Sequence, residues 1–100
     1  MVFFNPLEGM KYVSEVWRVA AEYEVYIESK KIKVKILENP EGKFIGITDH
    51  YIKTKKQATP YRSLHPQFSI EEALADAIRG LLAFYNPEEA KTCWIKDPEF

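Results

Sequence analysis

Side chains able to bind a metal or to act as nucleophiles are few and far apart in this 100-residue sequence. The candidate ligands are two histidines, an acid beside one of them and the single cysteine: Asp49, His50, His65 and Cys93. They lack the closely spaced pairs of a structural zinc site, and Cys93 is more typical of a small buried apolar residue than of an activated nucleophile. The four glycines form no phosphate-binding loop. We therefore expect no catalytic residue, no metal, no cofactor and no enzymatic activity.

The segment 49–68 combines cations with aromatic rings. Its candidate contacts to nucleic acid are Lys53, Lys55, Lys56, Tyr61 and Arg62. The cations would bind phosphates, and the tyrosine ring would stack on a base. Residues 30–62 hold nine Lys and Arg against three acidic residues, yet the whole chain has a net charge of −1. Because nucleic-acid-binding domains are usually basic, a nucleic-acid-binding module is the alternative interpretation here.

The segment from Ser69 to Tyr85 has the clearest secondary-structure pattern. Apolar residues recur every three or four positions along it, as on one face of a helix: Ile70, Ala73, Leu74, Ala77, Ile78, Leu81, Leu82 and Tyr85. Ser69 and Glu72 have the spacing of a capping box, and Asn86-Pro87 ends the helical pattern. This pattern predicts a helix whose apolar side packs on a sheet.

The N-terminal part of the chain has two interpretations. Asn5-Pro6-Leu7-Glu8 is typical of a helix start, and helical spacing of apolar residues continues to Ala21. The residues from Trp17 to Ile27 also alternate between apolar and polar, which would make one long strand. The cap and the pair Ala20-Ala21 favour a helix to about Ala21 followed by a strand.

Residues 22–48 predict a three-stranded antiparallel meander. A first turn at Ser29-Lys30 gives three apolar pairs on one face: Ile27 with Ile32, Val25 with Val34, and Tyr23 with Ile36. A turn at Lys30-Lys31 would preserve the faces and change only the partners. A type I turn over 39–42 adds two pairs to the same face: Ile36 with Ile45, and Val34 with Ile47.

The predicted fold is a single α+β domain over residues 1–100, of order α-β-β-β-α. Two helices cover one face of the three-stranded sheet, and a short C-terminal helix begins near Asn86-Pro87. The single cysteine suits a reducing cytoplasm. The apolar stretch Met1–Phe4 is too short for a signal peptide or a membrane span. We therefore expect a cytoplasmic protein that makes no membrane contact.

Two stretches resemble a known family of small phage proteins. SEVWRVAAEYEVYIES (14–29) followed by FSIEEALADAIRGLLAF (68–84) is similar to the phage ABA sandwich family. That resemblance implies a small phage or prophage protein with a Trp-containing first helix, a short sheet and an Ala-rich last helix. It transfers no catalytic residues. GKFIGIT (42–48) followed by FSIEEALADAI (68–78) resembles the HicB-like antitoxins, although the 20-residue connection and the preceding helix depart from their pattern.

The sheet face away from the helices is the main candidate for an interaction surface. The predicted register gathers Tyr26, Leu37 and Phe44 there among charged residues, as interaction surfaces often do. Cys93–Ile95 or Phe3-Phe4 would bury this patch if either segment folded over it. With the patch open, we expect a small non-enzymatic protein that binds a host protein, another macromolecule or a second copy of itself through these three residues.

Overall fold

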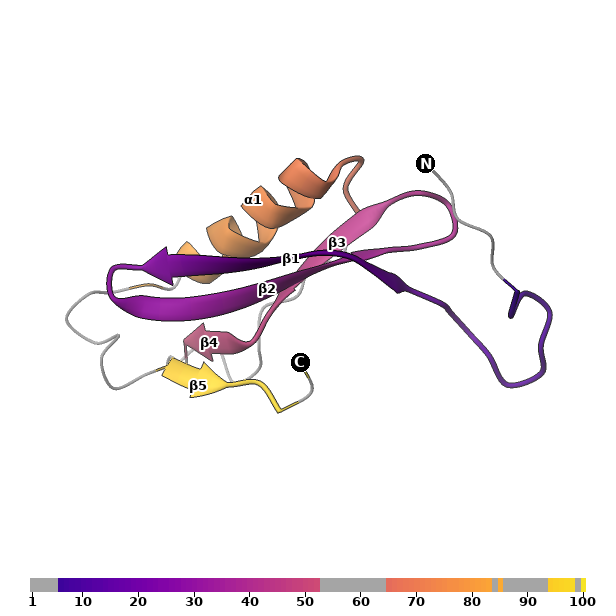
Figure 1. Cartoon of the computed structure of the whole chain (residues 1–100), viewed down its shortest axis with the longest axis horizontal. Helices are drawn as coiled ribbons and strands as arrows, with labels where there is room; N and C mark the ends of the chain where they lie inside the picture. Colours follow the sequence, from indigo (N-terminus) through magenta and orange to yellow (C-terminus); the bar gives the residue numbers. More distant parts are fainter. Residues whose placement is uncertain (1–5, 53–64, 84, 86–93, 99) are drawn as a thin grey trace.

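The computed structural model describes residues 6–52, 65–83, 85, 94–98 and 100. They form two small sheets and one helix (Figure 1). The elements in chain order are β1 (Arg18–Ile27), β2 (Lys30–Glu38), β3 (Phe44–Thr48), β4 (His50–Ile52), α1 (Ile70–Leu82) and β5 (Trp94–Lys96). Strands β1-β2-β3 make an antiparallel sheet in that order, and β4 pairs with β5.

The predicted α-β-β-β-α order is wrong, because α1 is the one helix in the described part of the chain and no second helix covers the sheet. Residues 6–13 form consecutive turns, in which the Met10 N–H donates to Leu7 at 3.0 Å and the Val13 N–H to Met10 at 3.3 Å. Gly9 and Tyr12 have φ of 80° and 73°, which no right-handed helix contains. The strand predicted from the apolar–polar alternation after Trp17 is therefore formed in place of the predicted helix. The expected helix after Asn86-Pro87 lies outside the described residues.

The first hairpin turns at Glu28-Ser29, one residue earlier than predicted. Ile27 lies opposite Lys30, Val25 opposite Ile32 and Tyr23 opposite Val34. Glu28 adopts φ of 56°, as tight two-residue hairpin loops require. From Ala21 to Ile27 each β1 residue consequently pairs two positions earlier on β2 than expected, and an even shift leaves the faces of both strands unchanged there.

The second hairpin differs by an odd number of residues, which reverses the faces of β3. Asn39 pairs with Lys43 through a 2.9 Å hydrogen bond from the Asn39 N–H, and Gly42 has φ of 81°. The loop therefore has three residues, a type I turn followed by a left-handed glycine, instead of the two residues expected. Ile45 lies opposite Leu37, and Ile47 opposite Lys35. Both isoleucines were predicted on the helix-covered face and lie on the other one.

Helix α1 packs on the sheet face that carries Gly46. A Cβ atom at Gly46 would lie 2.8 Å from the Ala73 backbone oxygen and 2.8 Å from the Ala77 Cβ. Only glycine permits this approach, so the two alanines contact the strand backbone itself. The core between helix and sheet is formed by Ile27, Ile32, Val34, Ile36, Phe44, Ile52, Ala73, Ala77 and Leu81.

The predicted start of α1 is confirmed, and its end comes three residues earlier than expected. The Ser69 hydroxyl accepts from the Glu72 N–H at 3.0 Å, as the capping box predicts. The Glu72 carboxylate accepts in return from the Phe68 N–H at 3.4 Å. The helix ends at Leu82, with Ala83 as its C-cap.

Candidate interaction surface

An apolar row crosses the sheet on the face away from α1. Val19 of β1 lies opposite Leu37 of β2, and Leu37 lies opposite Ile45 of β3. We call these three residues the apolar row. Val19 is 55% exposed, and the other two are half-buried. Adjacent cross-strand side chains are in contact distance on one face, so the row is a continuous apolar strip.

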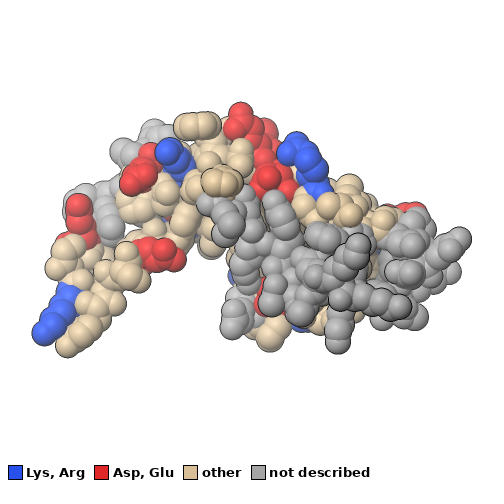
Figure 2. Space-filling view, turned by 180° about the vertical axis from the view of Figure 1, so that it is seen from behind, with Lys and Arg blue, Asp and Glu red and all other residues tan. Residues whose placement is uncertain are grey.

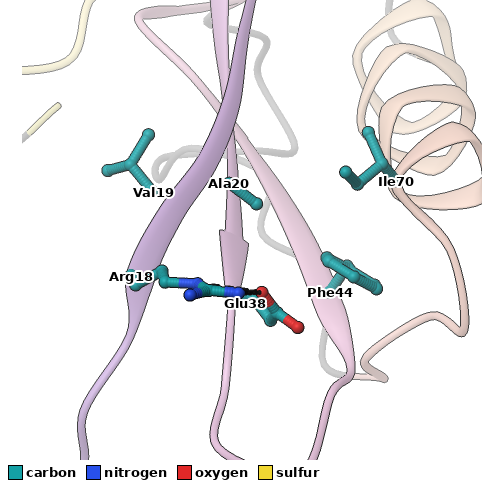
Figure 3. Close-up of a pocket in the computed structure, with 6 residues that line it drawn as sticks. All are labelled: Arg18, Val19, Ala20, Glu38, Phe44 and Ile70. Atoms are coloured by element: carbon teal, nitrogen blue, oxygen red, sulfur yellow. Dashed lines mark hydrogen bonds and ion pairs between the residues drawn. The ribbon is translucent and has the colours of Figure 1, made fainter. Parts of the chain in front are cut away.

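A β-bulge sets the position of Val19. The pairing shifts between Val19 and Ala21, leaving Ala20 without an opposite residue. The bulge turns the Val19 side chain away from Phe44 and Ile70, as Figure 3 shows. Without this extra residue, Val19 would not face the same side as Leu37.

The three residues predicted to bind a partner do not form a common patch. Tyr26 is 62% exposed and lies opposite Lys31. Lys31 precedes Leu37 by six residues, about 20 Å along β2. Phe44 lies opposite Glu38 and is buried on the α1 side. Of the three predicted residues, only Leu37 belongs to the apolar row. The sequence prediction did not include the other two members, Val19 and Ile45. The glycine that ends the Asn39–Gly42 turn was the sequence signal for the register that exposes Ile45.

The C-terminal residue covers part of the same face next to the apolar row. The Lys35 ammonium donates to the backbone oxygen of Phe100 at 3.0 Å and lies 4.2 Å from the centre of its ring. Lys35 precedes Leu37 by two residues on β2, so the two side chains are neighbours on one face. The Phe100 contact covers the face at Lys35, whereas Val19 at the end of the row stays exposed.

The N-terminal arm, residues 6–17, is a second apolar surface. It extends from β1 away from the sheet (Figure 1), and Figure 2 shows it as a projection with only scattered charged side chains. Large apolar residues are exposed along it: Leu7, Met10, Tyr12 and Val13. Tyr12 is 92% exposed. Such a concentration of exposed apolar side chains is typical of a segment that binds a protein surface.

The described lysines on the outer sheet face are largely engaged within the chain. Lys31 and Glu24 form an ion pair of 2.6 Å. The hydrogen bond from Lys31 holds the pKa of Glu24 below its usual range, and the same bond raises the pKa of Lys31. Lys33 lies opposite Glu24 in the register. The residues predicted to bind nucleic acid, Lys53 to Arg62, lie outside the described residues, and that alternative stays a prediction.

Two of the candidate metal ligands, Asp49 and His50, lie where β3 of one sheet is followed by β4 of the other. Asp49 Oδ1 accepts from the Lys33 N–H at 2.8 Å and contacts His50 Nδ1 at 2.8 Å. The Asp49 backbone bridges Lys33 and Asp97 through bonds of 3.0 and 2.7 Å. His65 is exposed elsewhere, and Cys93 lies outside the described residues. Within the described ranges, no three His, Cys, Asp or Glu side chains gather to hold a metal.

Comparison with known proteins finds no match to a family model, to a curated protein or to a solved structure. The resemblances to the phage ABA sandwich and to HicB-like antitoxins therefore stay predictions. The Trp-containing first helix that the former implies is not formed, since Trp17 lies just before β1. No helix in the described residues is long and apolar enough to cross a membrane.

Proposed function

We propose that this protein is a small non-enzymatic interaction protein, and that two copies bind each other with the N-terminal arm of each on the apolar row of the other. One observation carries the proposal: a single chain exposes two separate apolar surfaces, one on the arm and one on the sheet. Because the arm extends away from its own sheet (Figure 1), the surface that it would bind is the apolar row of a second copy.

A two-fold arrangement uses both surfaces twice. In a symmetric dimer every contact occurs in two equivalent copies, so each arm and each row is covered. Complete burial of one large apolar side chain is worth about 1.5–3 kcal/mol. Tyr12 is almost fully exposed and Met10 and Val19 are about half exposed, so their burial in both copies would act against the loss of rigid-body freedom on association.

Pairing through the strand edges is a less favourable way to associate. The outer edge of β1 has no strand beside it in the described structure. Glu22 and Glu24 are both exposed on this strand. An antiparallel pairing of two copies centred on Tyr23 would place Glu22 of each copy opposite Glu24 of the other, and like charges in that position are destabilising. The charged edge thus favours contact through the arm and the row.

Sedimentation equilibrium of single variants tests the proposal. Val19→Ser changes the row, and Tyr12→Ser changes the arm. Each should weaken dimerisation at least about tenfold, which corresponds to about 1.4 kcal/mol. The matched control is Tyr26→Ser, which changes an exposed residue on the same sheet face as Val19 but outside the row, and it should leave the dimer unchanged. A wild-type protein that stays monomeric at every attainable concentration contradicts the proposal, as does equal weakening by all three changes.

A further inference from the structure

A pocket lies on the α1 side of the sheet, where β1, β2 and β3 meet the start of the helix (Figure 3). Its volume is about 380 Å³. Six residues line it: Arg18, Val19, Ala20, Glu38, Phe44 and Ile70. Val19 belongs both to this lining and to the apolar row, and its side chain points away from Phe44 and Ile70 (Figure 3).

Glu38 is the buried charged group of this pocket, with 3% of its surface exposed. Arg18 donates from Nε at 3.0 Å and from Nη2 at 2.6 Å, and both bonds go to Oε1. Oε2 accepts no hydrogen bond from the described residues and points to the Phe44 side of the pocket (Figure 3). Oε2 is not enclosed, since Asp76 Oδ2 is the one fully buried side-chain oxygen without a partner among the described residues. Water therefore reaches Oε2, and a donor that enters the pocket can take the place of that water.

The walls define which donor fits. Phe44 presents an aromatic ring, and Ile70 and Ala20 provide aliphatic surface. A cation is attracted by an aromatic ring within about 6 Å of its centre, whereas an anion would be repelled by Glu38. A neutral apolar molecule would leave Oε2 without a donor. A short alkyl chain that carries a cationic N–H donor therefore matches the carboxylate oxygen, the ring and the aliphatic surface together.

The guanidinium of Arg18 does not exclude a second cation. It occupies the opposite oxygen of the carboxylate, and its side chain is half exposed, so solvent screens its charge. Glu71 and Glu72, which follow Ile70 in the first turn of α1, add negative charge to this end of the helix. Among the lining residues Glu38 is the one acidic group and Arg18 the one basic group, so any excess of negative charge comes from Glu71 and Glu72 beyond the lining.

We propose that this pocket binds a small primary alkylammonium ion, with its nitrogen donating to Glu38 Oε2 beside the Phe44 ring and its alkyl chain against Ile70. The three residues that would contact the ion, Glu38, Phe44 and Ile70, belong to neither the arm nor the apolar row, so the site can be tested whether or not the chain dimerises.

Titration followed by amide chemical shifts tests this site, with n-butylammonium as the probe. The wild type should show saturable shifts in Glu38, Phe44 and Ile70, whereas n-butanol and butyrate, of the same chain length, should not saturate. Glu38→Gln should weaken n-butylammonium binding at least tenfold. Phe44→Leu keeps the carboxylate and removes the ring, and should weaken binding about two- to fivefold, the range of an exposed cation–π contact. Glu22→Gln on exposed β1 is the matched charge control and should bind as the wild type does.

Several results would overturn the site. Equal binding of n-butanol would show an apolar pocket only, and tighter binding of butyrate would show an anion site at Arg18. Unchanged affinity in Glu38→Gln would remove the carboxylate from the site. If Glu38→Gln fails to fold, the comparison of the three probes on the wild type and the Phe44→Leu titration still decide the matter.

Discussion

Leu37 lies opposite Ile45 in the ladder between β2 and β3, on the sheet face that α1 leaves uncovered. With the two-residue loop predicted from the sequence, Ile45 would instead lie opposite Ile36 and would be buried under the helix. The loop of the second hairpin thus decides which isoleucines reach the surface, and it makes the apolar row possible.

The glycine that ends this loop should be sensitive to substitution. Gly42 has φ of 81°, where a side chain costs about 1–2 kcal/mol. Gly42→Ala should therefore lower the free energy of unfolding by about that amount in urea denaturation. Gly9→Ala is the control for local strain, because Gly9 has a similar φ of 80° but lies in the arm, outside both sheets. Equal losses of stability in both variants would contradict a role of Gly42 in the sheet.

Gly46 should tolerate even one methyl group poorly. Its added Cβ would lie 2.8 Å from the Ala73 backbone oxygen, so α1 would have to move away from β3. Overpacking of this kind costs about 1–3 kcal/mol, and Gly46→Ala should lower the urea midpoint accordingly. Ser29→Ala, in the exposed first turn, serves as a control without a packing change. An unaltered midpoint in Gly46→Ala would show that the helix does not approach the strand this closely.

The Asp49 carboxylate should stabilise the corner between the sheets by accepting hydrogen bonds. Asp49→Ala removes the acceptor for the Lys33 N–H and leaves that group without its partner, at a cost of about 1–3 kcal/mol. Asp49→Asn keeps an acceptor oxygen and should lose less stability in the same urea denaturation. A larger loss in Asp49→Asn than in Asp49→Ala would contradict this role.

The Glu24–Lys31 pair should be visible in an NMR titration of Glu24. Since the hydrogen bond from Lys31 lowers the Glu24 pKa, Lys31→Met should raise that pKa toward its usual range. Lys33→Met should raise it less, because Lys33 acts only through its charge. A lowered carboxyl pKa means that the pair contributes stability above the normal glutamate pKa and loses it as the pH falls through the lowered value. A Glu24 pKa that is the same in the wild type and in Lys31→Met would contradict the pair.

The parts of the fold that the sequence predicts well are those set by local contacts. Ser69 and Glu72 cap α1 within one turn, and the helical stripe continues directly from them. The faces of β2, and of β1 from Ala21 onward, were also predicted, because an even shift in register cannot reverse them. The local sequence pattern gave the wrong prediction near the N-terminus, where a helix-start signal is followed by residues that alternate as in a strand. Pairing with β2 makes these residues the strand β1 instead of a helix.

The candidate sites depend on contacts between distant residues, which no local pattern shows. Ile45 reaches the surface because one glycine lengthens a loop by a single residue. Val19 joins the row through a bulge whose position depends on the pairing with β2. Arg18 and Glu38 are twenty residues apart in the chain and meet only because the first hairpin closes in this register. For this reason the pocket that Arg18 and Glu38 line was not among the sites predicted from the sequence.

The most direct measurement of the central claim is an isotope-filtered NOE experiment on a dimer of one labelled and one unlabelled copy. The arm-on-row arrangement predicts intermolecular NOEs from the Tyr12 ring and the Met10 methyl group to the methyl groups of Val19, Leu37 and Ile45. Control spectra of Val19→Ser should lose these signals together with the dimer. A dimer whose intermolecular NOEs connect other surfaces, or a protein that gives none because it remains monomeric, would contradict the account.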